Sequence, residues 1–534
     1  MTQTPLEVVH SRLERLKRLQ TNIQYAIPAL WIPPHVHAGI RVLSNPAAYY
    51  HEIIGQILKS PIHTPLHAFG AKDVAYLLFI RYTTAWDHDG SKSISYTLNR
   101  DGWRQTGTFL KTIALLPYLR WLGITTLIIL PITQHGRARK KGTLGSPYAP
   151  SIHNAIEETL TEPILQLDSE IEFAALIEAC HRLGMRVIIE LALRVAALDC
   201  PLIESNPSWF YWVRADAPDP LLPPSFPPEE LAAIERRITT GNFQSLPEPS
   251  MDYRSLFVSP PVQVLRQDDG TYLGIGQDGT LCRVPSVFAD YPPNDTQPLW
   301  TDVTYLRLHS HPTFNYIAYN TVRYYDSQLA GHEQLSLWHY VLSVISSFLD
   351  KFDIDGILLD MGHALPKELH RRIIQLARSR KPNIILIEES FDCFDPLGYE
   401  LGYNAVVGDV WHWSYSIERL RSFACSVRGE SPLPYLATPD THNTPRIAQR
   451  GIETALYAYA LCSQLPHGIP TITTGSELGE QMPINTGLDF QPEELSAYSP
   501  EHLPLFSGCT LSWQNPDWRV LRFLRALYSG SNLS

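Results

Sequence analysis

Short apolar segments alternate with longer amphipathic segments from residue 73 onward, and this alternation constrains the fold of the 534-residue chain more than any other feature. Eight segments have the length and the near-continuous apolar character of strands that are buried on both faces. Stretches with helical spacing of apolar residues separate several of them, as in parallel sheets built from strand–helix units. Eight such units predict an α/β fold that closes into a (β/α)8 barrel. The segments are 73–83, 125–133, 185–193, 354–361, 383–390, 403–413, 433–440 and 468–475.

Additional sequence precedes and interrupts the repeat. Residues 1–72 contain helical patterns with a proline-marked break and predict a helical N-terminal extension. Residues 73–195 and 334–534 are expected to form the two parts of the barrel, with no C-terminal β-sandwich. Residues 196–333 are proline-rich and include a strand-like stretch at 270–284. Because a structureless loop of that length is unusual in a compact domain, we expect a subdomain inserted after the third strand.

Composition narrows the class of partner. The net charge of −11, with 18% charged residues, provides no basic surface for nucleic acid or for an anionic membrane. The sequence shows no signal-peptide pattern and no apolar run of membrane length, and its seven cysteines have no disulfide or C-x-x-C spacing. These features predict a soluble cytoplasmic protein with a small, neutral partner, and they leave a homodimer open.

Three carboxylates directly follow predicted strands: Asp360 after the fourth, Glu389 after the fifth and Asp440 after the seventh. In this type of barrel, the residues that perform the chemistry lie at the carboxyl ends of the strands. Two carboxyl groups that flank one bond can cleave a glycosidic linkage, one by attacking the anomeric carbon and the other by protonating the departing oxygen. Neighbouring strands are about 4.8 Å apart, which suits a retaining mechanism with Asp360 as nucleophile. For any one of these carboxylates, a helix cap or a loop role is an equally good explanation.

Several motifs between residues 76 and 488 resemble glycoside hydrolase family 13, the α-amylase family. They read YLRWLGITTLIILPI, GMRVIIELAL, DGILLDMGH, LIEESF and TPDTHNTPR. More narrowly, KKGTLGSPYAP, ELALRVAALDCPLIESNPSWF and ATPD are similar to the maltosyltransferase branch, which includes maltose-1-phosphate maltosyltransferases. The resemblance implies an α-glucan or maltooligosaccharide substrate and no cofactor. It also implies that Asp360 is the nucleophile, Glu389 the acid/base and Asp440 the stabiliser of the transition state.

Further residues are candidates for substrate binding. Glu388 and Glu389 compete for the acid role, and because successive strand residues face opposite sides, only one can face the barrel mouth. The family pattern favours Glu389. His363 matches a histidine of the maltosyltransferase pattern, Tyr148 could stack on a sugar ring, and Glu477 could bind substrate after the eighth strand. A loop histidine, a core aromatic ring and a solvated acid are the respective alternatives.

The sequence also departs from the family it resembles. Leu358 occupies a position where most members have an arginine that orients the nucleophile, Glu190 replaces an aspartate, and Arg194 replaces an asparagine or glutamine. A leucine cannot stabilise the ionised form of Asp360. We therefore hypothesise that Arg194 supplies the missing cation and that Glu190 and Arg194 share one strand face. The alternative is that Arg194 pairs with Glu190 in a barrel that has lost catalysis. Val195 stands where amylases have a substrate-binding histidine.

Metal and donor signals are weaker. Arg194 occupies the position of a calcium-binding asparagine of amylases, so no metal is expected there. Met361 replaces an asparagine of the phosphate-using branch, which leaves the use of a sugar phosphate donor open.

The sequence therefore predicts a retaining enzyme that transfers maltosyl or glucanosyl units between α-1,4-linked glucans. Amylase-like hydrolysis is the enzymatic alternative, and a catalytically decayed glucan-binding barrel is the other.

Overall fold

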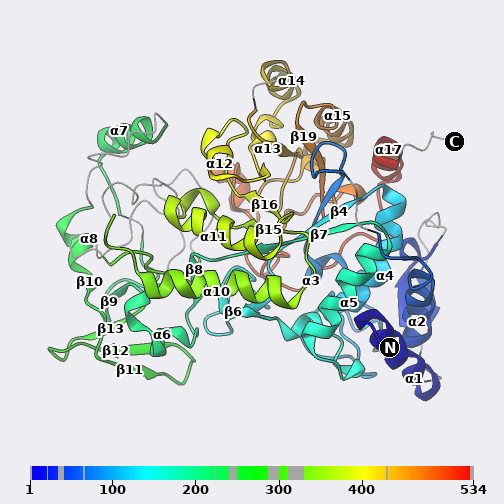
Figure 1. Ribbon diagram of the computed structural model, residues 1–534, viewed down its shortest axis with the longest axis horizontal. Helices are drawn as coiled ribbons and strands as arrows, with labels where there is room; N and C mark the ends of the chain where they lie inside the picture. The colour runs from blue at the N-terminus through cyan, green and yellow to red at the C-terminus, as the bar shows by residue number, and fades with distance from the viewer. Residues whose placement is uncertain are drawn as a thin grey trace.

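A closed barrel of eight parallel strands forms the centre of the computed structural model (Figure 1). The structure describes residues 3–20, 22–23, 25–33, 41–63, 67–222, 224–239, 249–286, 300–310, 330–427 and 431–529. The strands lie in the order β15-β16-β17-β18-β19-β3-β4-β7, and β7 pairs with β15 to close the barrel. Each lies within one of the eight predicted segments, which confirms the predicted fold class. Their bounds are β3 (Ala75–Leu78), β4 (Thr126–Ile129), β7 (Arg186–Leu191), β15 (Gly356–Leu359), β16 (Ile385–Glu388), β17 (Ala405–Val406), β18 (Tyr435–Ala437) and β19 (Gly468–Thr473).

Both faces of these strands are buried, which explains why their sequences are apolar throughout rather than alternating. One set of alternate residues fills the barrel interior, and the other set packs against the surrounding helices. The interior set comprises Ala75, Leu77, Ile128, Ile188, Leu358, Ile385, Ile387, Ala405, Leu436 and Ile469.

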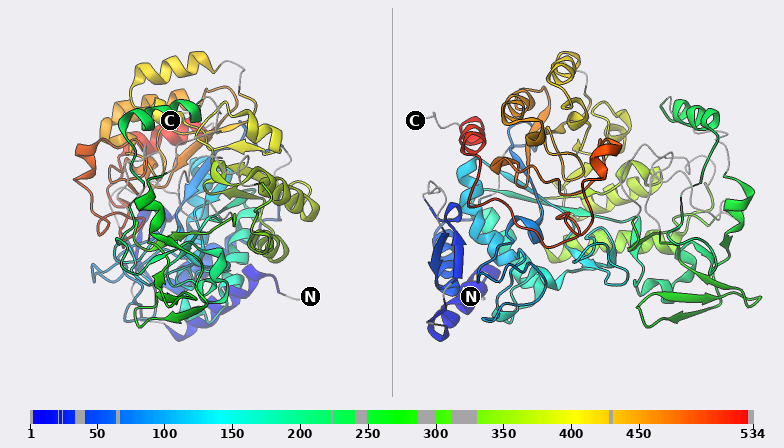
Figure 2. Two further views of the ribbon diagram at one scale, coloured as in Figure 1. Left: turned by 90° about the vertical axis from the view of Figure 1, so that its left-hand side faces the viewer. Right: turned by 180° about the vertical axis from the view of Figure 1, so that it is seen from behind.

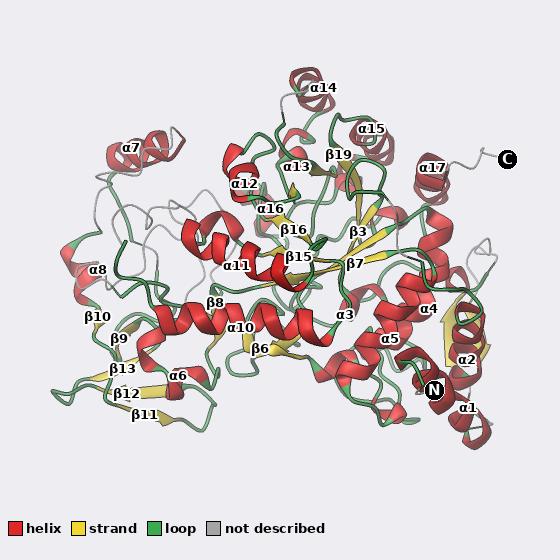
Figure 3. Ribbon diagram, viewed as in Figure 1, coloured by secondary structure: helices red, strands yellow, loops and turns green. Residues whose placement is uncertain are grey.

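Helices surround the barrel (Figure 3). The long ones are α4 (Phe109–Leu122), α5 (Ser169–Arg182), α10 (Leu335–Lys351), α11 (Lys367–Arg380), α14 (Ile417–Ser426), α15 (Ile452–Cys462) and α17 (Trp518–Ser529). Shorter helices are α3 (Ile80–Thr83), α12 (Pro396–Leu401), α13 (Val410–Trp413) and α16 (Pro492–Leu495). None of the helices among the described residues is both long enough and apolar enough to cross a bilayer.

The N-terminal segment contains more than helices. Helices α1 (Pro5–Leu19) and α2 (Pro46–Ile57) pack against each other and against α5. Between them, β1 (Tyr25–Pro28) and β2 (Arg41–Ser44) form an antiparallel pair that the sequence did not predict. The prolines around Pro28 indicate a break between two helical patterns, and such a break does not by itself predict strands.

The polypeptide between β7 and α10 projects from one side of the barrel (Figures 1 and 2). It leaves through β8 (Val195–Ala197) and returns through β14 (Val303–Tyr305), and these two strands pair antiparallel. Further out is a five-stranded sheet in the order β10-β9-β13-β12-β11, and two of its strands, β12 and β13, lie in the strand-like stretch 270–284. The sheet's bounds are β9 (Trp212–Arg214), β10 (Phe257–Val258), β11 (Gln263–Arg266), β12 (Tyr272–Ile275) and β13 (Leu281–Arg283). This part of the chain also contains helices α6 (Leu202–Ser205), α7 (Pro228–Thr239) and α8 (Met251–Ser255). A separate antiparallel pair, β5 (Thr133–His135) and β6 (Pro150–Ile156), follows β4.

A buried ion pair joins the amino-terminal ends of three neighbouring barrel strands. Arg186, at the start of β7, bonds to Asp73, which precedes β3, and the hydroxyl of Thr126 in β4 also donates to Asp73 over 3.2 Å. The exposed fraction of Asp73 is 0% and that of Arg186 is 5%. Removal of one partner from such a pair leaves the other charge buried without compensation.

We predict that Asp73→Asn lowers the free energy of unfolding by about 3 kcal/mol, measured by urea denaturation. The control is Lys351→Gln, which removes an exposed ion pair between Lys351 and Glu170. It should change the free energy by about 1 kcal/mol or less. Equal effects of the two substitutions would contradict the assigned importance of the buried pair.

Candidate active site

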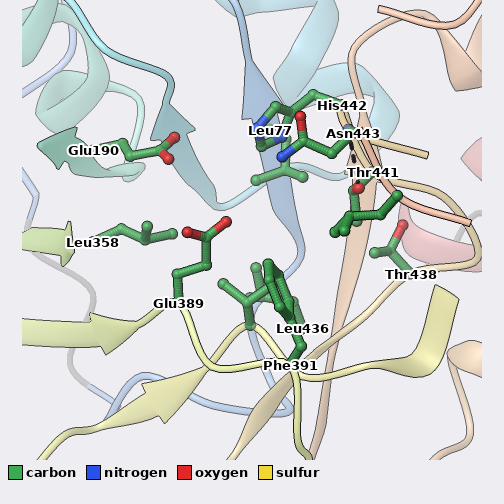
Figure 4. A pocket seen from close by; sticks show the side chains of 12 residues that line it. Leu77, Glu190, Leu358, Glu389, Phe391, Leu436, Thr438, Thr441, His442 and Asn443 are labelled. Atoms are coloured by element: carbon green, nitrogen blue, oxygen red, sulfur yellow. Dashed lines mark hydrogen bonds between the residues drawn. The ribbon is translucent and has the colours of Figure 1, made fainter. Parts of the chain in front are cut away.

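Three acidic side chains meet where neighbouring strands of the barrel end. Glu190 belongs to β7, Asp360 directly follows β15 and Glu389 directly follows β16, and β15 pairs with both of the other strands. One carboxylate oxygen from each residue lies within 4.8 Å of those from the other two. Their exposed fractions are 2%, 8% and 6%, respectively. Figure 4 shows Glu190 and Glu389 directed toward the same space. We call these three residues the acidic triad.

Electrostatic repulsion makes the fully ionised state of the acidic triad unfavourable. Two ionised carboxylates 4.8 Å apart repel each other by about 3.5 kcal/mol at an effective dielectric constant of about 20. Burial, followed by the charges of Asp360 and Glu389, raises the pKa of Glu190 well above its usual range, while a hydrogen bond with Tyr148 opposes the shift.

Tyr148 connects the acidic triad to the opposite side of the barrel mouth. Its hydroxyl lies 3.1 Å from Oε2 of Glu190 and 2.9 Å from Nε2 of His442. The rings of Tyr148 and His442 are nearly parallel, with centroids 5.9 Å apart. Burial lowers the pKa of His442 to about 4, so this imidazole is neutral at neutral pH. His442 was not among the residues expected at the site, although it lies two positions after Asp440 in TPDTHNTPR.

The backbone after Asp360 folds onto Glu389. The amide of Met361 donates to Oε2 of Glu389 over 2.5 Å, and Met361 has a φ of 48°, which is unusual for a residue with a side chain. His363 lies next to the same segment, with Nδ1 2.8 Å from the carbonyl oxygen of Glu389. His363 therefore helps to fix the backbone that presents Glu389.

A small pocket opens beside the acidic triad. Its walls are largely apolar, with polar groups concentrated on the Glu190–Glu389 side and on the segment after β18 (Figure 4). Glu389 rather than Glu388 faces the pocket, as alternation along the strand predicts. The lining residues are Leu77, Glu190, Leu358, Glu389, Phe391, Val407, Leu436, Thr438, Thr441, His442, Asn443 and Leu488.

Arg194 lies beyond the end of β7, whereas the expectation of a face shared with Glu190 assumed a continuous strand. Strand β7 ends at Leu191, so the alternation rule does not extend to residue 194. The Arg194 guanidinium lies over the ring of Tyr305, 5.4 Å from its centroid, and Nη1 lies 3.9 Å from Sδ of Met361. Arg194 lines a second pocket, together with Tyr211, Tyr305, Leu306, Leu308, His309, Ala364 and Pro366. Its proposed contact with Asp360 stays a prediction.

Asp440 is oriented differently from the other two predicted catalytic acids. Its Oδ1 accepts hydrogen bonds from the hydroxyls of Ser476, over 2.9 Å, and Tyr459, over 3.3 Å, and its Oδ2 accepts from the amide of Ile447 over 2.9 Å. Burial raises its pKa, and these donors together with Arg446 oppose the shift. The structure therefore directs Asp440 toward α15 and the segment after β19. Of the three predicted catalytic acids, Glu389 lines the pocket, whereas Asp360 and Asp440 do not.

Glu477 lies behind the barrel wall rather than in the pocket. Its Oε1 accepts a hydrogen bond of 2.9 Å from the hydroxyl of Tyr76, whose side chain belongs to the layer between the strands and the helices. Glu477 is fully buried, and burial raises its pKa to about 7. This position favours a role in packing over the substrate contact that the sequence suggested.

Within the described part of the chain, the acidic triad is the only group of three acidic, histidine or cysteine side chains close enough to surround a cation. Nothing beyond its acidity points to a metal, and we assign none.

Structural comparison defines the class of fold. An Anoxybacillus α-amylase superposes with a TM-score of 0.51 and 13% identity, covering 87% of this chain and 79% of that one. A cyclic α-maltosyl-(1→6)-maltose hydrolase from Arthrobacter globiformis superposes with a TM-score of 0.50 and 14% identity, covering 86% of this chain and 82% of the hydrolase chain. The chain thus has the fold of glycoside hydrolase family 13, the α-amylase family.

Sequence comparison adds a narrower and partial relationship. An α-1,4-glucan:maltose-1-phosphate maltosyltransferase from Cereibacter sphaeroides is 34% identical over 116 residues. The match spans 20% of this chain and 19% of the length of that relative. Comparison with protein-family models finds no match.

We predict that Tyr148→Phe lowers the free energy of unfolding by about 1–2 kcal/mol, because buried polar atoms of Glu190 and His442 lose a partner. Denaturant unfolding followed by fluorescence measures the change. Tyr399→Phe, at a side chain that is 62% exposed, serves as the control and should have an effect within about 0.5 kcal/mol. An unchanged midpoint for Tyr148→Phe would contradict the connecting role of its hydroxyl.

Proposed function

We propose that the protein is a retaining α-glucan-active enzyme that transfers maltosyl or glucanosyl units between α-1,4-linked glucans. The observation that carries this proposal is the position of Asp360 and Glu389 at the ends of paired strands, with carboxylate oxygens within 4.8 Å of each other. Retaining glycosidases hold their two carboxyl groups about 5–5.5 Å apart, whereas inverting enzymes need about 6.5–9.5 Å to admit a water molecule.

In the proposed reaction, the carboxylate of Asp360 attacks the anomeric carbon of the donor sugar. Glu389 gives its proton to the glycosidic oxygen, the carbon–oxygen bond breaks, and the leaving chain departs with a new hydroxyl group. In the second step, Glu389 takes the proton of an acceptor hydroxyl as the acceptor oxygen bonds to the anomeric carbon. This step releases Asp360 and restores the original configuration.

The choice of transfer over hydrolysis rests on the partial similarity to a maltosyltransferase. The apolar walls of the pocket agree with it, because Leu77, Phe391 and Leu436 offer surfaces to sugar C–H groups while disfavouring ordered water. If water were the acceptor instead, the same two carboxylates would catalyse hydrolysis.

The first test incubates the purified protein with maltoheptaose, with and without maltose-1-phosphate, and follows product lengths by chromatography. We expect a redistribution of chain lengths with retention of the α configuration by NMR. Glu389→Gln should lower the rate by roughly 10²–10⁴-fold, and Asp360→Asn should abolish turnover. Lys351→Gln, on the outer surface of α10, is the matched control and should retain the wild-type rate.

A covalent trap tests the nucleophile directly. Glu389→Ala treated with a maltosyl fluoride should accumulate a maltosyl ester on Asp360, because fluoride leaves without protonation while the second step lacks its base. Intact-mass and peptide mass spectrometry would show the adduct. Turnover by Asp360→Asn at the wild-type rate, or an adduct on another residue, would refute the assignment.

A glucan-binding barrel without catalysis is the second candidate, and the orientation of Asp440 favours it. A carboxylate bound to Ser476, Tyr459 and Ile447 supports the outer layer of the fold rather than a transition state. Leu358, at the position where an arginine was expected, also favours a barrel without catalysis, because a leucine cannot stabilise an ionised nucleophile. In this case calorimetry would detect maltoheptaose binding by a protein that leaves maltoheptaose unchanged.

Asp440→Asn distinguishes the two roles of this residue. If Asp440 is structural, as its contacts indicate, the substitution lowers the free energy of unfolding by about 1–3 kcal/mol and leaves kcat unchanged at temperatures well below unfolding. If it stabilises the transition state, kcat falls sharply under the same conditions.

A further inference from the structure

A leucine stands where the family has an arginine, and an acid lies next to it. Leu358 and Glu190 are register partners across the pairing of β15 with β7, so a glutamate lies directly beside the position where the family has an arginine. The interior of the barrel below them is apolar. In such surroundings, at least one carboxylate of the acidic triad needs a proton or a cation to neutralise its charge.

We propose that Glu190 holds a proton at neutral pH and, as a neutral acid beside Asp360, takes the place of the arginine charge. One fewer negative charge then opposes the ionisation of Asp360. The role of this proton in catalysis rests on the proposed function, whereas its location on Glu190 does not.

Hydrogen-bond geometry gives Glu190 a partner that can accept its proton. Oε2 of Glu389 accepts from the backbone amide of Met361, a group that can only donate, so the proton that Glu389 gives as the acid in the proposed reaction lies on its other oxygen. Glu190 instead meets the hydroxyl of Tyr148, which can either donate or accept. If the carboxyl group of Glu190 donates a hydrogen bond to the Tyr148 hydroxyl, this hydroxyl donates its own hydrogen bond to Nε2 of His442. Each of the two contacts then has one donor and one acceptor.

The charged and titratable groups around Glu190 support this assignment. Asp360 and Glu389 face it from β15 and β16, and Tyr148 faces it from the loop before β6, with neutral His442 behind. Arg194, later in the same segment as Glu190, has its guanidinium over Tyr305. Burial and the two neighbouring carboxylates raise the pKa of Glu190 well above its usual range.

The direction of the pH dependence follows from this shift. A carboxyl group whose pKa is higher in the folded state contributes stability that is fully present below its unfolded pKa and is lost as the pH rises through its folded pKa. Within that window, unfolding releases one proton from Glu190. The equilibrium constant for unfolding should therefore increase tenfold per pH unit relative to Glu190→Gln, whose neutral amide cannot ionise.

Infrared difference spectroscopy tests the proposal without reference to activity. The spectrum of wild type minus Glu190→Gln at pH 7 should contain the carbonyl stretch of a protonated carboxylic acid, and this band should disappear as the pH rises. Leu358→Arg should remove the same band at pH 7, because an adjacent guanidinium favours the ionised acid. This second variant and the titration of the wild type provide the readout if Glu190→Gln does not fold.

Glu172→Gln is the matched control. Glu172 is also buried, on α5 outside the barrel, and burial followed by the charge of nearby Glu162 raises its pKa well above its usual range. Its substitution should remove a different acid band and leave the band of Glu190 in place. A wild-type minus Glu190→Gln spectrum with only ionised carboxylate at pH 7 would overturn the proposal. So would a rise in melting temperature with Ca²⁺ that Glu190→Gln abolishes, because a cation would then neutralise the acidic triad.

Kinetics separates the failure of this proposal from the failure of the proposed function. If the enzyme is active, the acidic limb of the pH–rate profile, which reports the ionisation of Asp360, should stay in place in Glu190→Gln and in Glu172→Gln, because a neutral amide then replaces a neutral acid. A shift of this limb to lower pH in Glu190→Gln would show that Glu190 is charged in the wild type and would refute its positioning role. A protein that is inert toward glucans but shows the acid band would refute the proposed function while supporting the location of the proton.

Discussion

The parallel register of β7, β15 and β16 is the constraint on which the site depends. Because β15 pairs with both neighbours, Glu190 of β7 is in register with Leu358 and Ile387, and Asp360 and Glu389 each come two residues further along their strands. The three acids therefore meet at the carboxyl ends of the strands, above apolar interior side chains such as Ile188 and Ile385. The same closure that buries the strands therefore forces acidic groups together and removes the solvent that would screen them.

Much of this arrangement was accessible from the sequence. The eight strands were recognisable because burial on both faces produces apolar runs, and runs of this kind are bounded by polar residues where the barrel ends. Adjacency of the fourth and fifth strands predicted that Asp360 and Glu389 would be close. Alternation predicted that only one of Glu388 and Glu389 faces the mouth, and the family pattern selected Glu389. These inferences succeed because they depend on local periodicity and on the order of parallel strands.

Other features depend on contacts between distant segments, which one sequence does not reveal. Asp440 follows its strand as expected, but its orientation is set by Ser476 and Tyr459, which belong to different elements. The connection of Tyr148 to His442 spans 294 residues. The expectation for Arg194 extended the rule of alternation beyond the last residue of β7. The strands β1 and β2 were missed because their segment was interpreted as a proline-marked break between two helices.

The paired strands β8 and β14 join the two ends of the projecting polypeptide to the barrel, since the chain leaves at Val195 and returns at Tyr305. Because this ladder holds the two ends together, the entropy of closing the loop depends only weakly on how much chain lies between them. The return of the chain is also fixed beside the acidic triad. The ring of Trp300 contacts that of Tyr148, and Asp302 accepts from the amides of Lys141 and Ser146. The length of the outer part can therefore vary at little entropic cost, whereas its last residues before β14 are tied to the surroundings of the site.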